Sequence, residues 1–253
     1  MIAQAAPPAA INAPAPLPGR RFAPPTGRVL RLRTTQDRQI GPAHLRFVAE
    51  RRLVFRPDGA RFVAELTLDR VAAEPEGKTA ERYRVSQAGL LGRTLRFRLD
   101  ASGHVLSLDD LAGHWEAQAA GLDGTGTNPL RAFPPERQLT ALASLLLPAI
   151  APDLPAATGT SPVKVPLAGA PLPVDGTETF VRTPEALAVT TQAAGSISTP
   201  LGNGSGSVSR ERLFDPATGL LRHSEETTRM AVNGATGTAL ETVTTTRNEL
   251  TVS

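Results

Sequence analysis

The chain has 253 residues, no Cys, 4% aromatic residues and a formal net charge of +3. Without cysteine it can form neither disulfides nor thiolate metal sites, and no run approaches the roughly 18 apolar residues that a membrane-spanning helix needs. An excess of three charges over 27 basic and 24 acidic residues is too small to indicate a nucleic-acid partner. We therefore expect no nucleic-acid binding and no transmembrane segment.

The first 27 residues are rich in Ala and Pro, and Phe22 is their only aromatic residue. Burial within such a stretch cannot offset the entropy of ordering it, so we expect a disordered leader over residues 1–27. Ala3-Gln4-Ala5 has the small-x-small form that a signal peptidase cleaves. We therefore hypothesise that the chain is the mature form of an exported bacterial protein that resides in the periplasm. A cytoplasmic protein with an Ala/Pro-rich start is the alternative.

From residue 28 the apolar residues recur at every second position. This period predicts half-buried strands at about residues 28–35 and 45–55. The Arg-Pro-Asp-Gly sequence at 56–59 is typical of a tight turn, and residues 62–69 then form the return arm of a hairpin.

Arginine is dense on these early strands. The residues either contact anionic lipid headgroups or form a solvated, edge-protecting face. They are Arg28, Arg31, Arg33, Arg46, Arg51 and Arg52.

A second hairpin is expected after a charged loop at residues 74–78. Tyr83 and Val85 begin its period-two pattern, which continues through residues 95–99. An Asp-Ala-Ser-Gly turn then leads into a short strand at residues 105–108.

The segment at about residues 109–151 has a helical period instead. Asp109 or Asp110 caps a first expected helix, which ends near Gly121, and a flexible break follows at 124–128. A second helix is expected over residues 134–150, because it starts with two prolines and carries apolar residues at helical spacing. These residues are Leu139, Leu142, Leu145, Leu146 and Ile150.

A Pro-rich crossing over residues 151–173 and a Gly/Ser-rich connection over 195–206 separate the later elements. The expected strands here are residues 179–182, 186–191, 207–215, 220–232 and 238–252. The whole pattern predicts a mainly β (α+β) chain. Residues 28–253 form one antiparallel domain, a curved sheet or half barrel with an inserted helical segment.

This layout resembles the LolA/LolB-like periplasmic proteins and related lipoproteins. The resemblance covers about residues 28–253. It lies in the two amphipathic hairpins, the Asp-x-Ser-Gly turn at 100–103, the helical insertion and the closing Phe-Asp-x-x-Thr-Gly turn at 214–219. It implies a strongly curved antiparallel sheet whose concave face is covered by helices, with acyl chains or other apolar ligands held between them.

If the hairpins curve around the second helix, the space between them is expected to be an apolar cavity. The hypothesis is that the chain binds or carries a lipid or another hydrophobic molecule without changing it chemically. The candidate lining residues are Phe47, Phe55, Phe62, Leu66, Phe97, Leu142 and Leu146.

Two alternatives stay open. The same side chains can pack on one another and leave no cavity, as apolar stripes ordinarily do. The chain can also be a structural or interaction module of the bacterial envelope, which docks a partner protein through an exposed sheet edge.

Motifs for catalysis or cofactor binding are not found in the sequence. The four histidines lie in separate predicted elements without metal-ligand spacing. There is neither a Gly-x-Ser-x-Gly nucleophile motif nor a phosphate-binding loop. The adjacent carboxylates Glu225 and Glu226 face opposite sides of a strand. We therefore expect no enzymatic activity, no cofactor and no metal.

Overall fold

The computed structural model describes residues 22–122, 128–151, 158–167, 170, 172–199, 202–233 and 239–253. The first six strands in this part of the chain are β1 (Val29–Ile40), β2 (Ala43–Asp58), β3 (Arg61–Glu74), β4 (Thr94–Leu99), β5 (Val105–Leu108) and β6 (Gly159–Val165). The other five are β7 (Val174–Arg182), β8 (Leu187–Thr199), β9 (Gly202–Phe214), β10 (Leu221–Asn233) and β11 (Ala239–Val252). The helical elements are α1 (Lys78–Ala88), α2 (Leu111–Ala120), η1 (Pro129–Ala132), α3 (Pro135–Ala143) and η2 (Leu147–Ala149).

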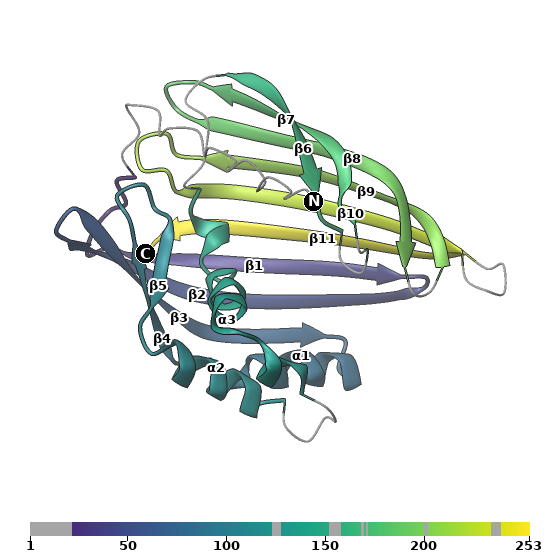
Figure 1. Ribbon diagram of the computed structural model, residues 1–253, viewed down its shortest axis with the longest axis horizontal. Helices are drawn as coiled ribbons and strands as arrows, with labels where there is room; N and C mark the ends of the chain where they lie inside the picture. The colour runs from purple at the N-terminus through teal and green to yellow at the C-terminus, as the bar shows by residue number, and fades with distance from the viewer. Residues whose placement is uncertain are drawn as a thin grey trace, which may run out of the picture.

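All eleven strands form one antiparallel sheet, in the order β5-β4-β3-β2-β1-β11-β10-β9-β8-β7-β6 (Figure 1). Consecutive strands pair with each other, except β5 and β6, which lie at opposite edges. The first and last strands also pair, so that Leu30 of β1 lies opposite Val252 of β11 and Ile40 opposite Thr242. The sheet is not closed into a barrel, because β5 and β6 remain as its two edges. The mainly β, half-barrel-like architecture expected from the sequence is confirmed.

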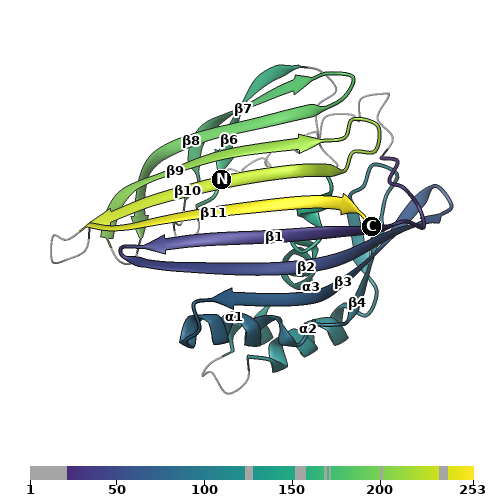
Figure 2. The same ribbon diagram turned by 180° about the vertical axis from the view of Figure 1, so that it is seen from behind.

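The helices lie on one side of the sheet. In Figure 1, α3 crosses in front of β1 and β2, and in Figure 2 the same helix lies behind these strands. We call the face toward α3 the inner face and the opposite one the outer face. Since side chains alternate along a strand, each strand presents every second residue to the inner face.

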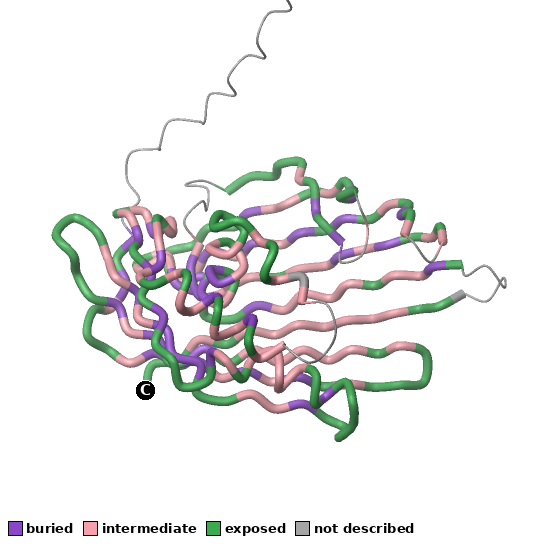
Figure 3. The backbone as a smooth tube through the Cα atoms, turned by 60° about the horizontal axis from the view of Figure 1, so that its bottom comes forward, coloured by how far each residue is buried: buried purple, intermediate pink, exposed green. Residues whose placement is uncertain are grey.

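The main core lies between the inner face of β1–β4 and the helices α2 and α3. Many of the buried backbone positions gather at the end of the sheet that carries these helices (Figure 3). Each large apolar side chain buried there contributes roughly 1.5–3 kcal/mol to the free energy of unfolding. The fully buried residues include Leu30, Leu53, Phe55, Leu66, Leu95, Phe97, Leu142 and Leu146.

Three smaller apolar clusters lie elsewhere on the inner face. One consists of Phe47, Ala73 and Ala80, with Leu45 and Tyr83 packed against it. A second lies on β7–β10 and contains Phe180, Leu187, Val189, Phe214 and Leu221. The third lies on β6–β10 and the residues just after β6, and contains Val165, Leu167, Val174, Ala193, Ile197, Val208 and Val232.

The expected disordered leader is wrong from Phe22 onward. The Phe22 ring packs edge-on against Phe55 and Phe62, with centroids 5.6 and 5.5 Å apart, and is only 6% exposed. Thr26 forms an isolated bridge with Phe55. Burial of one aromatic side chain thus offsets the ordering of the residues around it. Residues 1–21 lie outside the described part of the chain.

The strand expected at Tyr83 and Val85 is also wrong, because both residues lie in helix α1. Two apolar residues spaced by two fit a helix as well as a strand, and the surrounding Lys, Ala, Glu, Arg and Gln favour a helix. In this helix Tyr83 packs against Phe47, with the two ring centroids 4.8 Å apart.

The helical insertion is largely as expected, and its second helix is shorter. Asp110 caps α2, since its side chain accepts a hydrogen bond from the Gly113 amide at 3.3 Å. Helix α3 ends at Ala143 rather than Ile150, because Pro148 removes an amide donor and its ring would clash with the carbonyl four residues earlier. The break expected at 124–128 lies mostly outside the described residues.

The later strands are longer than expected. The Pro-rich crossing contains strand β6, and the Gly/Ser-rich connection is occupied by the ends of β8 and β9. Pro162 is tolerated in β6 because this strand lies at the sheet edge, with β7 as its partner. Gly206 in β9 leaves space for Leu167, whose Cδ1 atom would collide with any β-carbon there.

Candidate functional site

Most of the residues expected to line an apolar cavity lie in one closely packed core. Phe62 is partly buried and packs against this core. Phe47 lies apart from it, in the cluster with Tyr83. The five residues within the core are at most 1% exposed: Phe55, Leu66, Phe97, Leu142 and Leu146.

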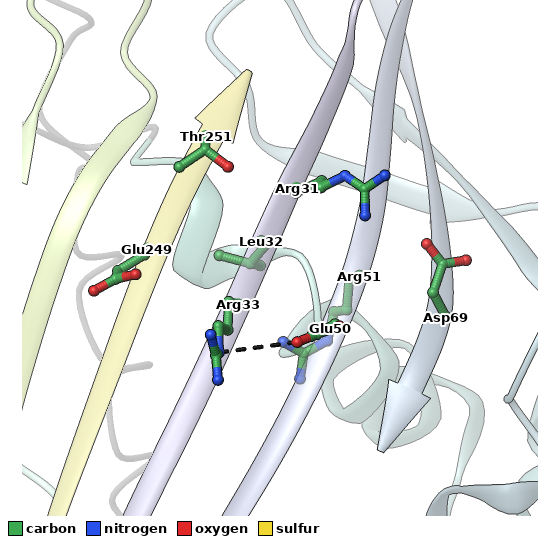
Figure 4. A pocket seen from close by; sticks show the side chains of 8 residues that line it. All are labelled: Arg31, Leu32, Arg33, Glu50, Arg51, Asp69, Glu249 and Thr251. Carbon is green, nitrogen blue, oxygen red and sulfur yellow. Dashed lines mark ion pairs between the residues drawn. The ribbon is translucent and has the colours of Figure 1, made fainter. Parts of the chain in front are cut away.

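Three hollows formed by described residues lie elsewhere, and none of these three is lined by the seven residues. Figure 4 shows one of about 290 Å³, which lies across β1, β2, β3 and β11. In this hollow, Arg33 Nε lies 3.9 Å from Glu50 Oε1. The other charged residues at this hollow are Arg31, Arg51, Asp69 and Glu249. The hollow is thus polar and mixed in charge, and does not resemble an apolar ligand cavity.

Several arginines of the outer face are paired with carboxylates across strands. Arg52 Nη2 forms an ion pair with Asp69 Oδ1 at 3.1 Å, and Arg46 Nε forms one with Asp37 Oδ1 at 2.7 Å. Such exposed pairs contribute little individually and keep the strand face solvated. The pairing favours the solvated-face interpretation of these arginines over contacts with lipid headgroups.

Arg51 differs from the other arginines of the early strands because it points to the inner face. It alternates in phase with Ala49 and Leu53 and is only 9% exposed. Its Nη1 donates a hydrogen bond to Thr34 Oγ1 at 2.8 Å, while its buried Nε has no partner. Burial lowers the pKa of Arg51 from its ordinary value, and the nearby Tyr83 opposes this shift.

Sequence reasoning grouped Arg51 with the outward-facing arginines and so missed it. The signal was present, since Arg51 falls on the same period-two face as Leu45 and Phe55. An arginine at an apolar position of an amphipathic strand is the pattern that could have revealed this buried charge.

Arg51 begins a chain of hydrogen bonds across four strands. Thr34 of β1 donates to Asn248 Oδ1 of β11 at 2.7 Å, and Asn248 Nδ2 donates to Ser224 Oγ of β10 at 3.0 Å. Arg212 of β9 lies opposite Ser224. We call Arg51, Thr34, Asn248 and Ser224 the inner polar row.

Beyond this row the inner face carries two ion pairs. Arg212 Nη2 bonds to Glu178 Oε1 at 2.5 Å, and Thr191 donates to the same oxygen at 2.8 Å. Arg210 pairs with Glu226 on the neighbouring strand. Each of these two arginines therefore has a carboxylate partner.

The centre of the inner face continues as a floor of half-buried polar residues on β1, β10 and β11. An apolar cluster flanks the floor on each side, one with Phe47 and Tyr83 and the other with Val208 and Met230. Among the described residues, no helix lies in front of the ends of β1, β10 and β11 that are away from α3 (Figure 1). We call this region the inner floor, and its residues are Gln36, Arg38, Thr228, Thr244 and Thr246.

A scan against protein-family models finds no match for the chain, and a search of curated proteins finds no relative. No helix within the described residues combines the length and the apolar character needed to cross a bilayer. Nor does the described part of the chain place three or more His, Asp or Glu side chains together as a metal site. The inner face offers apolar clusters beside hydrogen-bonding groups and positive charge, an arrangement suited to binding an amphipathic molecule.

Proposed function

We propose that the chain binds and carries a lipid or another hydrophobic molecule on its inner face, without changing it chemically. The observation that carries this proposal is the inner floor, which is half-buried and polar and lies between two apolar clusters. A sheet that served only as a scaffold would be expected to cover its inner face with close-packed apolar side chains. Here the central strands place threonines there.

The ligand is proposed to lie over the inner floor and not beneath α3. Leu142 and Leu146 are at most 1% exposed and pack directly on the core of β1–β4. A close-packed interior holds few voids larger than a water molecule. Next to the floor, Leu45 and Met230 are only partly buried, so apolar surface remains there for a hydrocarbon chain.

The resemblance in layout to the LolA/LolB-like proteins supports the same proposal. A half-barrel-like sheet with helices on one face is what that resemblance implies. A periplasmic location for an exported protein is part of the proposal, and fits a carrier that moves apolar molecules between membranes.

A paired substitution tests the ligand site. Thr244→Trp places a large ring on the inner floor, whereas Thr245→Trp places the same ring on the outer face of the same strand. We expect the purified wild-type protein to take up a fluorescent fatty acid and to carry lipid that organic extraction and mass spectrometry detect. Thr244→Trp should reduce the uptake at least fivefold, and Thr245→Trp should leave it unchanged.

Two results would overturn the proposal. One is the absence of both copurifying lipid and fatty-acid uptake in the wild-type protein. The other is an equal loss of uptake in both variants while each keeps the wild-type circular dichroism spectrum, since a ring on the outer face cannot block the inner floor.

A role as an envelope interaction module is the second candidate, and strand β6 favours it. This strand lies at a sheet edge and most of its residues are exposed, so an extended segment of a partner protein can add to it. Pro162 and Lys164 on the same strand argue against this role, because they are typical of edges protected against such pairing. Binding of such a partner should be lost when β6 is disrupted, whereas lipid uptake should remain intact.

A further inference from the structure

Arg51 is a buried cation whose charge no carboxylate balances. Its side chain forms one hydrogen bond, to the neutral Thr34 hydroxyl, and its Nε atom is buried without a partner. No ion pair involves it among the residues that the structure describes. Buried charges in proteins are ordinarily paired, because removing a charge from water costs several kcal/mol. The arrangement therefore leaves an anion unaccounted for.

The groups around Arg51 do not supply that anion. Glu50 points to the outer face, where it approaches Arg33 and Arg70. Tyr83 is the ionisable group that acts on the pKa of Arg51, and burial raises the pKa of the Tyr83 phenol, which keeps it protonated. The carboxylates of the inner face are engaged elsewhere, Glu178 with Arg212 and Glu226 with Arg210. A guanidinium keeps its proton at any physiological pH, so the charge of Arg51 persists.

We propose that Arg51 binds the anionic headgroup of the carried molecule, which makes that molecule an anionic amphiphile. This inference rests on the proposed function. A carboxylate or a phosphate monoester fits, because either accepts two parallel hydrogen bonds from a guanidinium. The shared chemistry is a small oxyanion at the end of a hydrocarbon chain.

The inner polar row provides the path to Arg51. Burial is least in the middle of this row: Arg51 is 9% exposed and Ser224 7%, whereas Thr34 and Asn248 between them are half-buried. Gln36 follows Thr34 along the same face of β1 and belongs to the inner floor. A headgroup held at Arg51 therefore leaves its hydrocarbon chain over the floor and its flanking clusters, where the proposed function needs it.

Three probes with the same oleyl or oleoyl chain test the inference at pH 8: oleate, oleoyl lysophosphatidic acid and oleyl alcohol. Each is titrated against a fluorescent fatty acid below its critical micelle concentration. The wild-type protein should bind at least one anionic probe about tenfold more tightly than the alcohol, as expected for a charge-assisted hydrogen-bonded pair. The stronger of the two anionic probes identifies the headgroup as carboxylate or phosphate.

Arg51→Met should remove this preference, with anionic affinity reduced about tenfold and alcohol affinity within twofold of wild type. Arg52→Met, one residue along on the outer face, is the matched control and should keep the preference. Equal wild-type affinity for all three probes would overturn the headgroup assignment while leaving the proposed function standing. No binding of any probe would overturn both. The comparison of the three probes on the wild-type protein needs no variant, so it tests the headgroup assignment even if Arg51→Met fails to fold.

Discussion

Arg46 donates a hydrogen bond from Nε to Asp37 Oδ1 at 2.7 Å, across the β1–β2 pair. Arg247 of β11 approaches the other oxygen, Oδ2, at 3.3 Å. Asp37, whose side chain is 16% exposed, thus joins three strands where the N-terminal and C-terminal halves of the sheet meet. The hydrogen bond from Arg46 outweighs the effect of burial, so the pKa of Asp37 lies below its ordinary value.

This relationship predicts a pH dependence. A carboxylate with a lower pKa in the folded than in the unfolded state stabilises the fold above its unfolded pKa, and that contribution is lost as pH falls through the folded pKa. The melting temperature should therefore decrease when the pH is lowered below about 4, and Asp37→Asn should make the melting temperature less dependent on pH. Asp175→Asn, at an exposed pair on β7, is the control. Identical pH profiles for wild type and Asp37→Asn would contradict the prediction.

Removal of the unbalanced charge of Arg51 should not destabilise the protein. Methionine fills a similar volume without a desolvation penalty, so Arg51→Met should melt at or above the wild-type temperature. Arg212→Met is the contrasting variant, because it leaves Glu178 unpaired and should cost about 2 kcal/mol. Calorimetry measures the melting temperature of both variants. A strong loss of stability in Arg51→Met would show that the charge of Arg51 is balanced within the protein.

Leu146 and Leu147 provide a matched test of the core beneath α3. Leu146 is fully buried, whereas Leu147 is 42% exposed. Leu146→Ala should lower the free energy of unfolding by about 2–5 kcal/mol, and Leu147→Ala by about 0.5 kcal/mol or less. Urea denaturation measures both. Similar small effects would mean that the space beneath α3 is loosely filled.

The close approach of α1 to α2 depends on Gly89. A β-carbon at this position would collide with the Ala117 carbonyl, which belongs to the backbone of α2 and cannot move aside cheaply. Gly89→Ala should therefore destabilise the protein by about 1–3 kcal/mol. Gly159→Ala, where a β-carbon meets nothing within 4 Å, should have little effect in the same denaturation assay.

The edge strand β6 is predicted to resist self-association through Pro162 and Lys164. Replacing both with Val should create a flat apolar edge and produce dimers or larger species in light scattering. Thr177→Val on the neighbouring strand β7 is the control, because β7 is paired on both sides. If the double variant remains monomeric at high concentration, the two residues do not protect the edge.

The strands were largely predictable, because local alternation determines them. Leu30 and Leu32 follow the period-two rule, and Asp110 caps its helix as its residue type predicts. The pairing of β1 with β11 was not predictable, because it joins residues more than 200 positions apart that share no local pattern. Helix α1 was missed because its two apolar residues fit either period.

The candidate site was harder to predict than the fold. The apolar residues chosen as cavity lining do face inward, but period alone does not distinguish a filled core from an open space. Arg51 was missed for a different reason, since its residue type argued for the surface while its phase in the strand argued for the interior. Phase proved the better guide, because backbone alternation is geometric whereas the preference of a residue type is only statistical.

The pairing of β1 with β11 also imposes an order on biosynthesis. A ribosome produces β1 early, and the hairpins of the first half can form as they emerge. The second edge of β1, however, keeps its backbone donors and acceptors unpaired until residues 239–252 have been made. A long exposed edge in a nascent chain invites association with other chains. Folding of this protein therefore depends on protecting the middle of the sheet, and not only its rims, until the last strand arrives.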